Sequence, residues 1–177
     1  MHPKIPSRTA AGLATLLLAV GPAWSQVPES VDPAAIPNYR VIHAGLAVAG
    51  QPSPEALARL GEMGFRTVVN LRTERESGKD AERAVRDAGL EYVWVPVAPA
   101  TFSAADVDAV AKVVEDPDAR PVLLHCSSSN RSGAVWAVLQ VRRGRSIQDA
   151  EADGRAAGLT SDSMVAAFRR VAAERAP

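Results

Sequence analysis

The segment HCSSSNRSG, residues 125–133, groups the side chains of this chain that could do covalent chemistry. It contains Cys126, the only cysteine, and Arg131, with a short polar stretch between them. A thiolate is a strong nucleophile, and a guanidinium presents a planar set of donors that suits phosphate-like oxyanions. The pattern therefore predicts a cysteine nucleophile beneath a bound oxyanion.

The flanking residues predict where this segment lies in a fold. PVLL, residues 121–124, is typical of a buried strand, and AVWAVLQV, residues 134–141, is typical of a packed helix. At such a strand-to-helix turn the first helical N–H groups lack intrahelical partners, and the helix dipole favours an anion. We therefore expect the Cys126 thiol to ionise more readily than a free cysteine. The candidate anion-binding residues are Ser127, Ser128, Ser129, Asn130 and Arg131.

Two neighbours of the loop could support this chemistry. His125 could add positive charge beside the thiol, and Ser132 could cap the helix or donate to the sulfur when the sulfur is the leaving group. The simpler interpretation is that a lone cysteine at a strand end is a small buried hydrophobe, and that Arg131 merely pairs with a carboxylate. The joint occurrence of these residue types favours the catalytic interpretation.

The His-Cys-loop-Arg-Ser arrangement resembles the signature of the cysteine-dependent protein tyrosine and dual-specificity phosphatase superfamily. The wider chain resembles, more particularly, the bacterial phosphatase-like domain of beta-lactamase-hydrolase-like proteins, which is related to the phosphatase-like domain fused to NAD kinases. Three stretches carry this resemblance: AGQPSPEALARLGEMGFRTVVNLRTERE, GLEYVWVPV and PVLLHCSSSNRSGAVWAV. The similarity extends from about residue 39 to about residue 160. It implies a phosphatase-like fold and catalysis through a phosphocysteine at Cys126.

The loop departs from the superfamily pattern in two ways. Phosphatases of the superfamily place five residues between cysteine and arginine, whereas this chain has four, which is the spacing typical of rhodanese-type sulfurtransferases. The resembled family also tends to carry glycine where this chain has Ser129. A residue other than glycine with positive φ costs on the order of 1 kcal/mol. Ser129 must bear that cost, or the loop must turn differently.

The acid that would protonate the leaving oxygen is also missing from its expected place. Phosphatases of this type supply an aspartate after an earlier strand, but residues 98–101 read APAT. Asp106 is the nearest carboxylate downstream. Because Ser103 and Asp106 form a capping-box pattern, we favour a capping role over acid catalysis for Asp106. Without a general acid, turnover of alkyl phosphates should fall by about a hundredfold or more.

Alternating strand and helix patterns predict an α/β fold with a mainly parallel central sheet flanked by helices, as in protein tyrosine and dual-specificity phosphatases. Ligands in such folds bind beyond the carboxyl ends of the strands, where Cys126 would lie. Arg72 would also lie there and could enlarge the anion site, or it could be a surface arginine paired with Glu74 or Glu76. We expect strands at 39–42, 46–49, 67–71, 92–97 and 122–124, and helices at 54–63, 79–88, 104–115 and 132–143, with two more beginning near Ser146 and Ser161.

The 177 residues, 47% of them hydrophobic, suffice for one core. Residues 1–25 carry two basic residues, an apolar stretch at 10–20 and the sequence AWS, which together predict a secretory signal cut before Gln26. The apolar stretch is shorter than the roughly 20 residues needed to span a bilayer, although an uncleaved anchor is the alternative. We expect a linker at 26–38 and a single phosphatase-like domain at 39–177.

The charge balance and the cysteine count exclude several classes of function. After loss of the signal the chain would carry about two more acidic than basic residues, so it has no nucleic-acid footprint. A single cysteine excludes an intramolecular disulfide and a dithiol redox cycle. The signal predicts a periplasmic or secreted protein with no stable membrane insertion after cleavage. We expect no metal or other cofactor, and the Cys126 loop predicts a phosphate- or sulfur-bearing substrate as the partner.

Three functions fit these observations. The first is an exported phosphatase that acts through a phosphocysteine. The second is a sulfurtransferase that carries a persulfide on Cys126, which would need neither the longer loop nor an acid. The third is a module that binds an oxyanion without turning it over. The resemblance favours the phosphatase.

Overall fold

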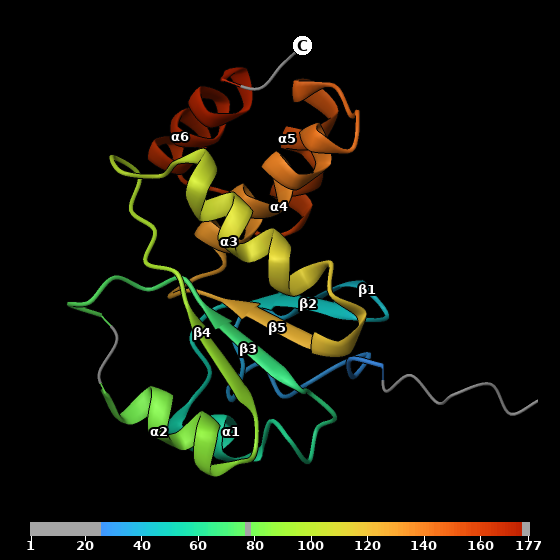
Figure 1. Cartoon of the computed structure of the whole chain (residues 1–177), viewed down its shortest axis with the longest axis vertical. Coiled ribbons are helices and arrows are strands. Elements are labelled where there is room, and N and C mark those ends of the chain that lie inside the picture. Colours follow the sequence, from blue (N-terminus) through green and yellow to red (C-terminus); the bar gives the residue numbers. More distant parts are fainter. Residues whose placement is uncertain (1–25, 77–78, 175–177) are drawn as a thin grey trace, which may run out of the picture.

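The computed structural model describes residues 26–76 and 79–174 of the chain. Within them a five-stranded sheet forms, with the strand order β1-β2-β5-β3-β4 (Figure 1). Its first pair, β1 and β2, is antiparallel, and the other neighbours are parallel, as expected for an α/β fold. The strands are β1 (Arg40–His43), β2 (Leu46–Ala49), β3 (Thr67–Asn70), β4 (Glu91–Trp94) and β5 (Val122–His125).

Helices cover both faces of this sheet (Figure 1). One face carries α1 (Pro54–Arg59) and α2 (Lys79–Asp87). The other carries α3 (Ala104–Val114), the short 3-10 helix η1 (Pro117–Ala119), α4 (Asn130–Arg142), α5 (Ile147–Ala156) and α6 (Asp162–Ala173). The fold is therefore a sandwich of three layers, which explains why the central strands β3 and β5 are buried along their whole length.

Alternate residues of each strand pack into the two cores on opposite sides of the sheet. In β5, Val122 and Leu124 face the core under α3, α4 and α6, whereas Leu123 faces the core over α1 and α2. Strand β2 divides in the same way, with Leu46 and Val48 on the first side. This period of two follows from the pleat of a strand.

The serines expected to begin helices do so. The side chains of Ser53, Ser103, Ser146 and Ser161 each accept a backbone N–H of the first turn of their helix. Helix α4 differs from expectation, because it begins at Asn130 and not at Ser132. Its N-cap residue, Ser129, has a left-handed backbone and makes no side-chain cap, so the usual capping signal is absent.

Residues 26–38, expected to be a linker, contain no helix or strand but pack on the domain. Val27 and Ile36 are buried in the core beside α1, and the Tyr39 hydroxyl donates to the Pro28 carbonyl (2.6 Å). The expected signal at residues 1–25 lies outside the described residues. Within the described part of the chain, none of the helices has the length and apolar character needed to cross a membrane.

The sheet brings the ends of its central strands to one edge. His125 ends β5 and is in register with Ala49 of β2 on one side and with Asn70 of β3 on the other. Asn70 is in turn in register with Trp94 of β4. The residues that follow these four positions therefore lie next to one another, and Cys126 follows the central strand.

Candidate active site

Cys126 lies at the carboxyl end of the central strand, and the loop after it is fastened to the residues that follow β2. The Cys126 N–H donates to the Ala49 carbonyl (3.2 Å), and the Gln51 N–H donates to the Ser127 carbonyl (3.1 Å). Gly50 and Ser128 form an isolated antiparallel bridge. The predicted oxyanion-binding loop is therefore fixed at residues 126–128 by backbone contacts with the segment that follows β2.

Ser129 bears the backbone cost that the sequence implies. Its φ is +71°, in the left-handed region that favours glycine. Its hydroxyl donates to the Ala157 carbonyl (2.9 Å), and a hydrogen bond of about 1 kcal/mol offsets strain of similar size. Gly158 leaves the space for this side chain, since a Cβ there would lie 2.7 Å from the Ser129 Cβ. Serine at 129 and glycine at 158 thus fit as a pair.

Asn130 connects the loop to the start of α6. Its Oδ1 accepts the backbone N–H groups of Thr160 and Ser161, both at 2.7 Å. Its Nδ2 donates to the Ser128 hydroxyl (3.2 Å). The side chain expected to bind an anion therefore positions α6, a helix about thirty residues further along the chain.

Arg131 is the most constrained side chain of the site. Its Nη1 and Nη2 donate to the two carboxylate oxygens of Glu76, both at 2.8 Å, in the bidentate geometry that makes such pairs strong. Nη1 also approaches the carbonyls of Leu71 and Val97, each at 3.3 Å, and Nη2 donates to the Ser127 hydroxyl (2.9 Å). The expectation that Arg131 could pair with a carboxylate is confirmed, and Glu76 is its partner.

The Glu76 carboxylate is fully satisfied in this arrangement. Besides Arg131, it accepts the Ser127 hydroxyl (2.7 Å), and the backbone N–H (2.9 Å) and hydroxyl (2.6 Å) of Thr73. The hydrogen bonds from Arg131, followed by those from Ser127 and Thr73, hold the pKa of Glu76 well below its usual range. The pKa of Arg131 is raised, chiefly by Glu76 and further by the charge of the Cys126 sulfur. The pair is therefore ionised at neutral pH, with the guanidinium beside Cys126.

His125 does not supply the positive charge expected beside the thiol. Its ring is buried, and this burial lowers the pKa of His125 to about 4. Its Nδ1 lies 3.4 Å from the Cys126 carbonyl oxygen. At neutral pH the ring is uncharged, so the field at Cys126 comes from Arg131 and from the amino end of α4.

Ser132 is not the helix cap, because Ser129 occupies that position and Ser132 is the third residue of α4. Its hydroxyl is buried, with no partner among the described residues. A buried hydroxyl without a partner is costly by about 1–3 kcal/mol and is available to a bound group. The hydroxyl is therefore free for the second predicted role, donation to the Cys126 sulfur as a leaving group.

The structure does not bring Asp106 to the anion-binding loop, and it connects Arg72 to that loop through Gln51. The Asp106 carboxylate accepts the Ser103 N–H and hydroxyl, both at 2.9 Å, so the predicted capping box is confirmed. Arg72 lies at the expected edge, near enough for its charge to lower the pKa of His125, but its Nη1 donates to Gln51 Oε1 (2.7 Å). Arg72 therefore contacts the amide of Gln51 and not Glu74 or Glu76, the partners considered from the sequence.

A cavity of about 400 Å³ opens beside the loop and extends to the start of α6. Cys126 has no exposed surface and does not itself line the cavity, so an oxyanion can contact the sulfur only after the residues that cover the sulfur move. No group of three His, Cys, Asp or Glu side chains in the described residues could hold a metal ion. The cavity is lined by Thr73, Glu76, Val97, Ala98, Pro99, Ser128, Asn130, Arg131, Ser161, Ser163 and Met164.

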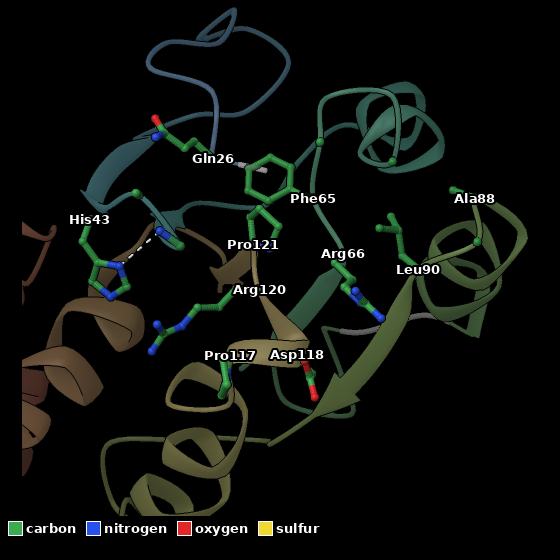
Figure 2. A pocket seen from close by; sticks show the side chains of 15 residues that line it. Gln26, His43, Phe65, Arg66, Ala88, Leu90, Pro117, Asp118, Arg120 and Pro121 are labelled. Atoms are coloured by element: carbon green, nitrogen blue, oxygen red, sulfur yellow. Dashed lines mark hydrogen bonds between the residues drawn. The ribbon is translucent and has the colours of Figure 1, made fainter. Parts of the chain in front are cut away.

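A second cavity, of about 930 Å³, lies at the opposite edge of the sheet (Figure 2). Arg66, Leu90 and Pro121 line it, and each immediately precedes a parallel strand, so this cavity is at the amino ends of β3, β4 and β5. Although larger, it is separated from Cys126 by the length of β5. The chemistry of Cys126 therefore belongs to the smaller cavity.

Residues 38–143, more than half of the chain, match the family described as "Beta-lactamase hydrolase-like protein, phosphatase-like domain". The chain belongs to this family. The resemblance noted in the sequence is thereby confirmed.

Curated relatives of this phosphatase-like domain are longer proteins. The Beta-lactamase hydrolase-like protein of Xylella fastidiosa (strain Temecula1) is 34% identical over 137 residues, which cover 74% of this chain and 32% of the relative. The protein of the same name from Agrobacterium fabrum is 28% identical over 109 residues, covering 59% of this chain and 25% of the relative. The chain thus spans about a third or less of these relatives.

Solved structures share the fold of the phosphatase-like domain. TpbA of P. aeruginosa matches with a TM-score of 0.64 at 22% identity, covering 88% of this chain and 92% of TpbA. The core catalytic domain of the PP-IP phosphatase SIW14 from S. cerevisiae matches with a TM-score of 0.63 at 14% identity, covering 76% and 83% of the two chains. The expected fold is therefore confirmed.

Proposed function

We propose that this chain is a cysteine-dependent phosphatase that hydrolyses phosphate monoesters, with Cys126 as nucleophile. The observation that carries the proposal is the position of Cys126, between the carboxyl end of the central strand and the amino end of α4, with the Arg131 guanidinium beside the sulfur. The matched family and the solved structure of a TpbA variant in complex with phosphotyrosine support it.

The reaction would proceed in two displacements. The Cys126 thiolate attacks phosphorus as the ester P–O bond breaks, and Arg131 with the loop N–H groups stabilises the equatorial oxygens. Water then attacks the phosphocysteine, the S–P bond breaks, and orthophosphate leaves while the thiolate is regenerated. The Ser132 hydroxyl, which has no other partner among the described residues, would donate a hydrogen bond to the sulfur as it departs.

The leaving oxygen would take its proton from solvent. Among the described residues that line the cavity, Glu76 is the one carboxylic acid, and its lowered pKa keeps it ionised. A group that carries no proton at neutral pH cannot act as the general acid. Esters with acidic leaving groups, such as aryl phosphates, should therefore be the better substrates.

Sulfur transfer is the alternative, favoured by the four-residue spacing and by this lack of a protonated acid. In that reaction the Cys126 thiolate attacks the outer sulfur of thiosulfate, the S–S bond breaks, and sulfite leaves. The resulting persulfide passes its outer sulfur to a nucleophile such as cyanide, which gives thiocyanate and restores the thiolate.

One pair of assays separates these functions. The purified protein is given aryl phosphates of varied leaving-group pKa and, separately, thiosulfate with cyanide, each beside Cys126→Ser and Arg131→Ala variants. We expect phosphate release that requires Cys126 and falls steeply as the leaving-group pKa rises. Thiocyanate formation without phosphate release would favour sulfur transfer. No turnover in either assay, with orthophosphate still raising the Tm, would favour a binding module.

We also propose that the protein is exported, on the basis of the basic and apolar pattern of residues 1–25. Expression of the full chain followed by N-terminal sequencing of the periplasmic fraction tests this. A mature chain that begins at Gln26 is expected, and an intact chain retained in the cytoplasm would contradict the proposal.

A further inference from the structure

The cavity beside Cys126 carries almost no net charge. Of the described residues that line it, Arg131 is the one cation and Glu76 the one anion, and their side chains form a salt bridge at 2.8 Å. The Arg131 side chain is only 11% exposed, so its charge is neutralised where water screens it least. An anion that binds in this cavity therefore meets a single guanidinium, and that guanidinium already forms a salt bridge with Glu76.

The wall of the cavity at the start of α6 is formed by hydroxyl and apolar groups. Ser161 is engaged as the cap of α6, since its hydroxyl accepts the Met164 N–H (3.2 Å). Ser163 is exposed on the first turn of the same helix. Pro99 and Met164 complete this wall. Such groups can contact an uncharged ring or chain, but they cannot neutralise a second phosphate.

The other charges near this wall do not compensate. Arg170, which follows on α6, donates from both Nη atoms to the backbone carbonyls of Phe102 (3.1 Å) and Pro99 (3.0 Å), and it does not line the cavity. The amino end of α6 also borders the cavity, but Asp162, between the two lining serines, already places a carboxylate against the dipole of that helix. The favourable dipole of α4 acts within its first turn, so it serves one oxyanion close to Cys126.

We infer that this site selects a single phosphoryl group on a small uncharged remainder and discriminates against ligands with further phosphates, with Glu76 and Ser163 setting this charge preference. The inference rests on the proposed phosphatase function. A second phosphate in the cavity would lie against hydroxyl groups and near Asp162, and would lose hydration without gaining a cation. The size of the cavity also favours a small substrate, because a volume of about 400 Å³ holds only a small group beside the phosphate.

The test compares two aryl monophosphates of matched leaving-group pKa, one with a neutral ring and one with a phosphonate on the ring. We expect the purified protein to prefer the neutral ring by roughly tenfold in kcat/KM, since like charges that meet without a partner are strongly disfavoured. Ser163→Arg should reduce this preference by about threefold, the effect of a partly exposed ion pair. Ser163→Gln, which adds length without charge, should leave the ratio unchanged.

The inference would be overturned if the wild-type protein used both esters equally or preferred the phosphonate, or if the Arg and Gln variants shifted the ratio alike. A binding measurement separates its failure from that of the proposed function. Orthophosphate should raise the Tm more than tripolyphosphate at equal ionic strength, and Ser163→Arg should narrow the difference. If orthophosphate gives the larger shift but no Cys126-dependent hydrolysis is detected, the proposed phosphatase function is refuted and the charge preference is supported. An equal or larger shift with tripolyphosphate, or no shift with either anion, would refute the charge preference whether or not esters are hydrolysed.

Discussion

Arg131 is fixed in direction before any substrate binds. Its two terminal nitrogens contact Glu76, Ser127 and the carbonyls of Leu71 and Val97, which belong to the segments following β3 and β4. A donor group that is held in place does not lose that conformational freedom on binding, which is a common source of affinity and rate. We therefore regard Glu76 as the residue that positions Arg131.

Glu76→Gln keeps the shape of the side chain and removes its charge, and Glu74→Gln makes the same change at the exposed neighbour two residues earlier. We expect Glu76→Gln to lower kcat/KM for aryl phosphates by about tenfold and Glu74→Gln to have little effect. Steady-state kinetics of the two variants measure this. Equal effects of the two changes would show that Glu76 has no special role.

The same pair predicts a dependence of stability on pH. Because the pKa of Glu76 is lowered on folding, its stabilisation is present above the ordinary value of 4.5 and is lost as the pH falls toward the folded value. The Tm of the wild type should exceed that of Glu76→Gln at pH 7, and the difference should shrink below about pH 4. Thermal melts of both proteins across this range test it, and a constant difference would contradict the assigned ionisation.

His125 should titrate far below an ordinary histidine. Its pKa is about 4 in the folded protein, against 6.5 for the free side chain, so the unfolded chain binds the extra proton first. Stability should therefore fall as the pH drops from 6.5 toward 4, by up to about 3 kcal/mol from this residue. An NMR titration of the ring measures the value, and a midpoint near 6.5 would show that the ring is hydrated.

The sequence identifies the residues of the nucleophile loop but not all of their partners. Cys126 and Arg131 could be predicted because their types and spacing lie within one short segment. Glu76 could not, because its contact with Arg131 spans 55 positions and arises from the pairing of β5 with β3. In the sequence it is one of several alternating charges, which normally indicate a solvated loop.

At the level of helices and strands, close packing of α4 against α5 places the start of α4. Gly133, one turn into α4, faces Gly154 of α5, and a Cβ on Gly133 would lie 2.6 Å from both the Gly154 oxygen and the Leu159 nitrogen. Backbone atoms cannot yield as a flexible side chain can. The glycine therefore lets α4 pack closely on α5 at the turn that follows the Cys126 loop.

Gly133→Ala should separate α4 from α5. We expect a loss of about 1–3 kcal/mol in unfolding free energy, as for other overpacked sites, and weaker binding of orthophosphate because the first turn of α4 shifts. Gly144→Ala is the control: an alanine there would be strained by the positive φ (+88°), but its Cβ would meet nothing within 4 Å. Denaturant melts with and without phosphate compare them, and unchanged phosphate binding in Gly133→Ala would contradict this role of the packing.

The positions of helices and strands follow closely from sequence patterns, and the differences have local causes. Helix α4 begins two residues early because its cap is the strained Ser129, which no capping pattern reveals. The strand expected at 92–97 ends at Trp94, and residue 97 instead lines the cavity and offers its carbonyl to Arg131. Both differences occur at the site, where tertiary contacts override local preference.

Over the whole molecule, the cavity collects residues from four separate segments, at positions 73–76, 97–99, 128–131 and 161–164. An anion that binds there should therefore stabilise the entire fold. At a hundred times its Kd, orthophosphate should add about 2.7 kcal/mol to the unfolding free energy. Arg131→Met should abolish this gain, whereas Arg59→Met, an exposed arginine on α1, should retain it. An equal gain in both variants would place the phosphate elsewhere.

The central claim is that Cys126 forms a covalent bond to the transferred group. Rapid quenching of the Ser132→Ala variant during turnover of an aryl phosphate, followed by mass spectrometry of its peptides, tests this directly, because loss of the donor to the departing sulfur should slow hydrolysis of the intermediate. We predict a phosphoryl group on the peptide that contains Cys126. Phosphate release with no phosphoryl group on that peptide, or with one on another residue, would contradict the account.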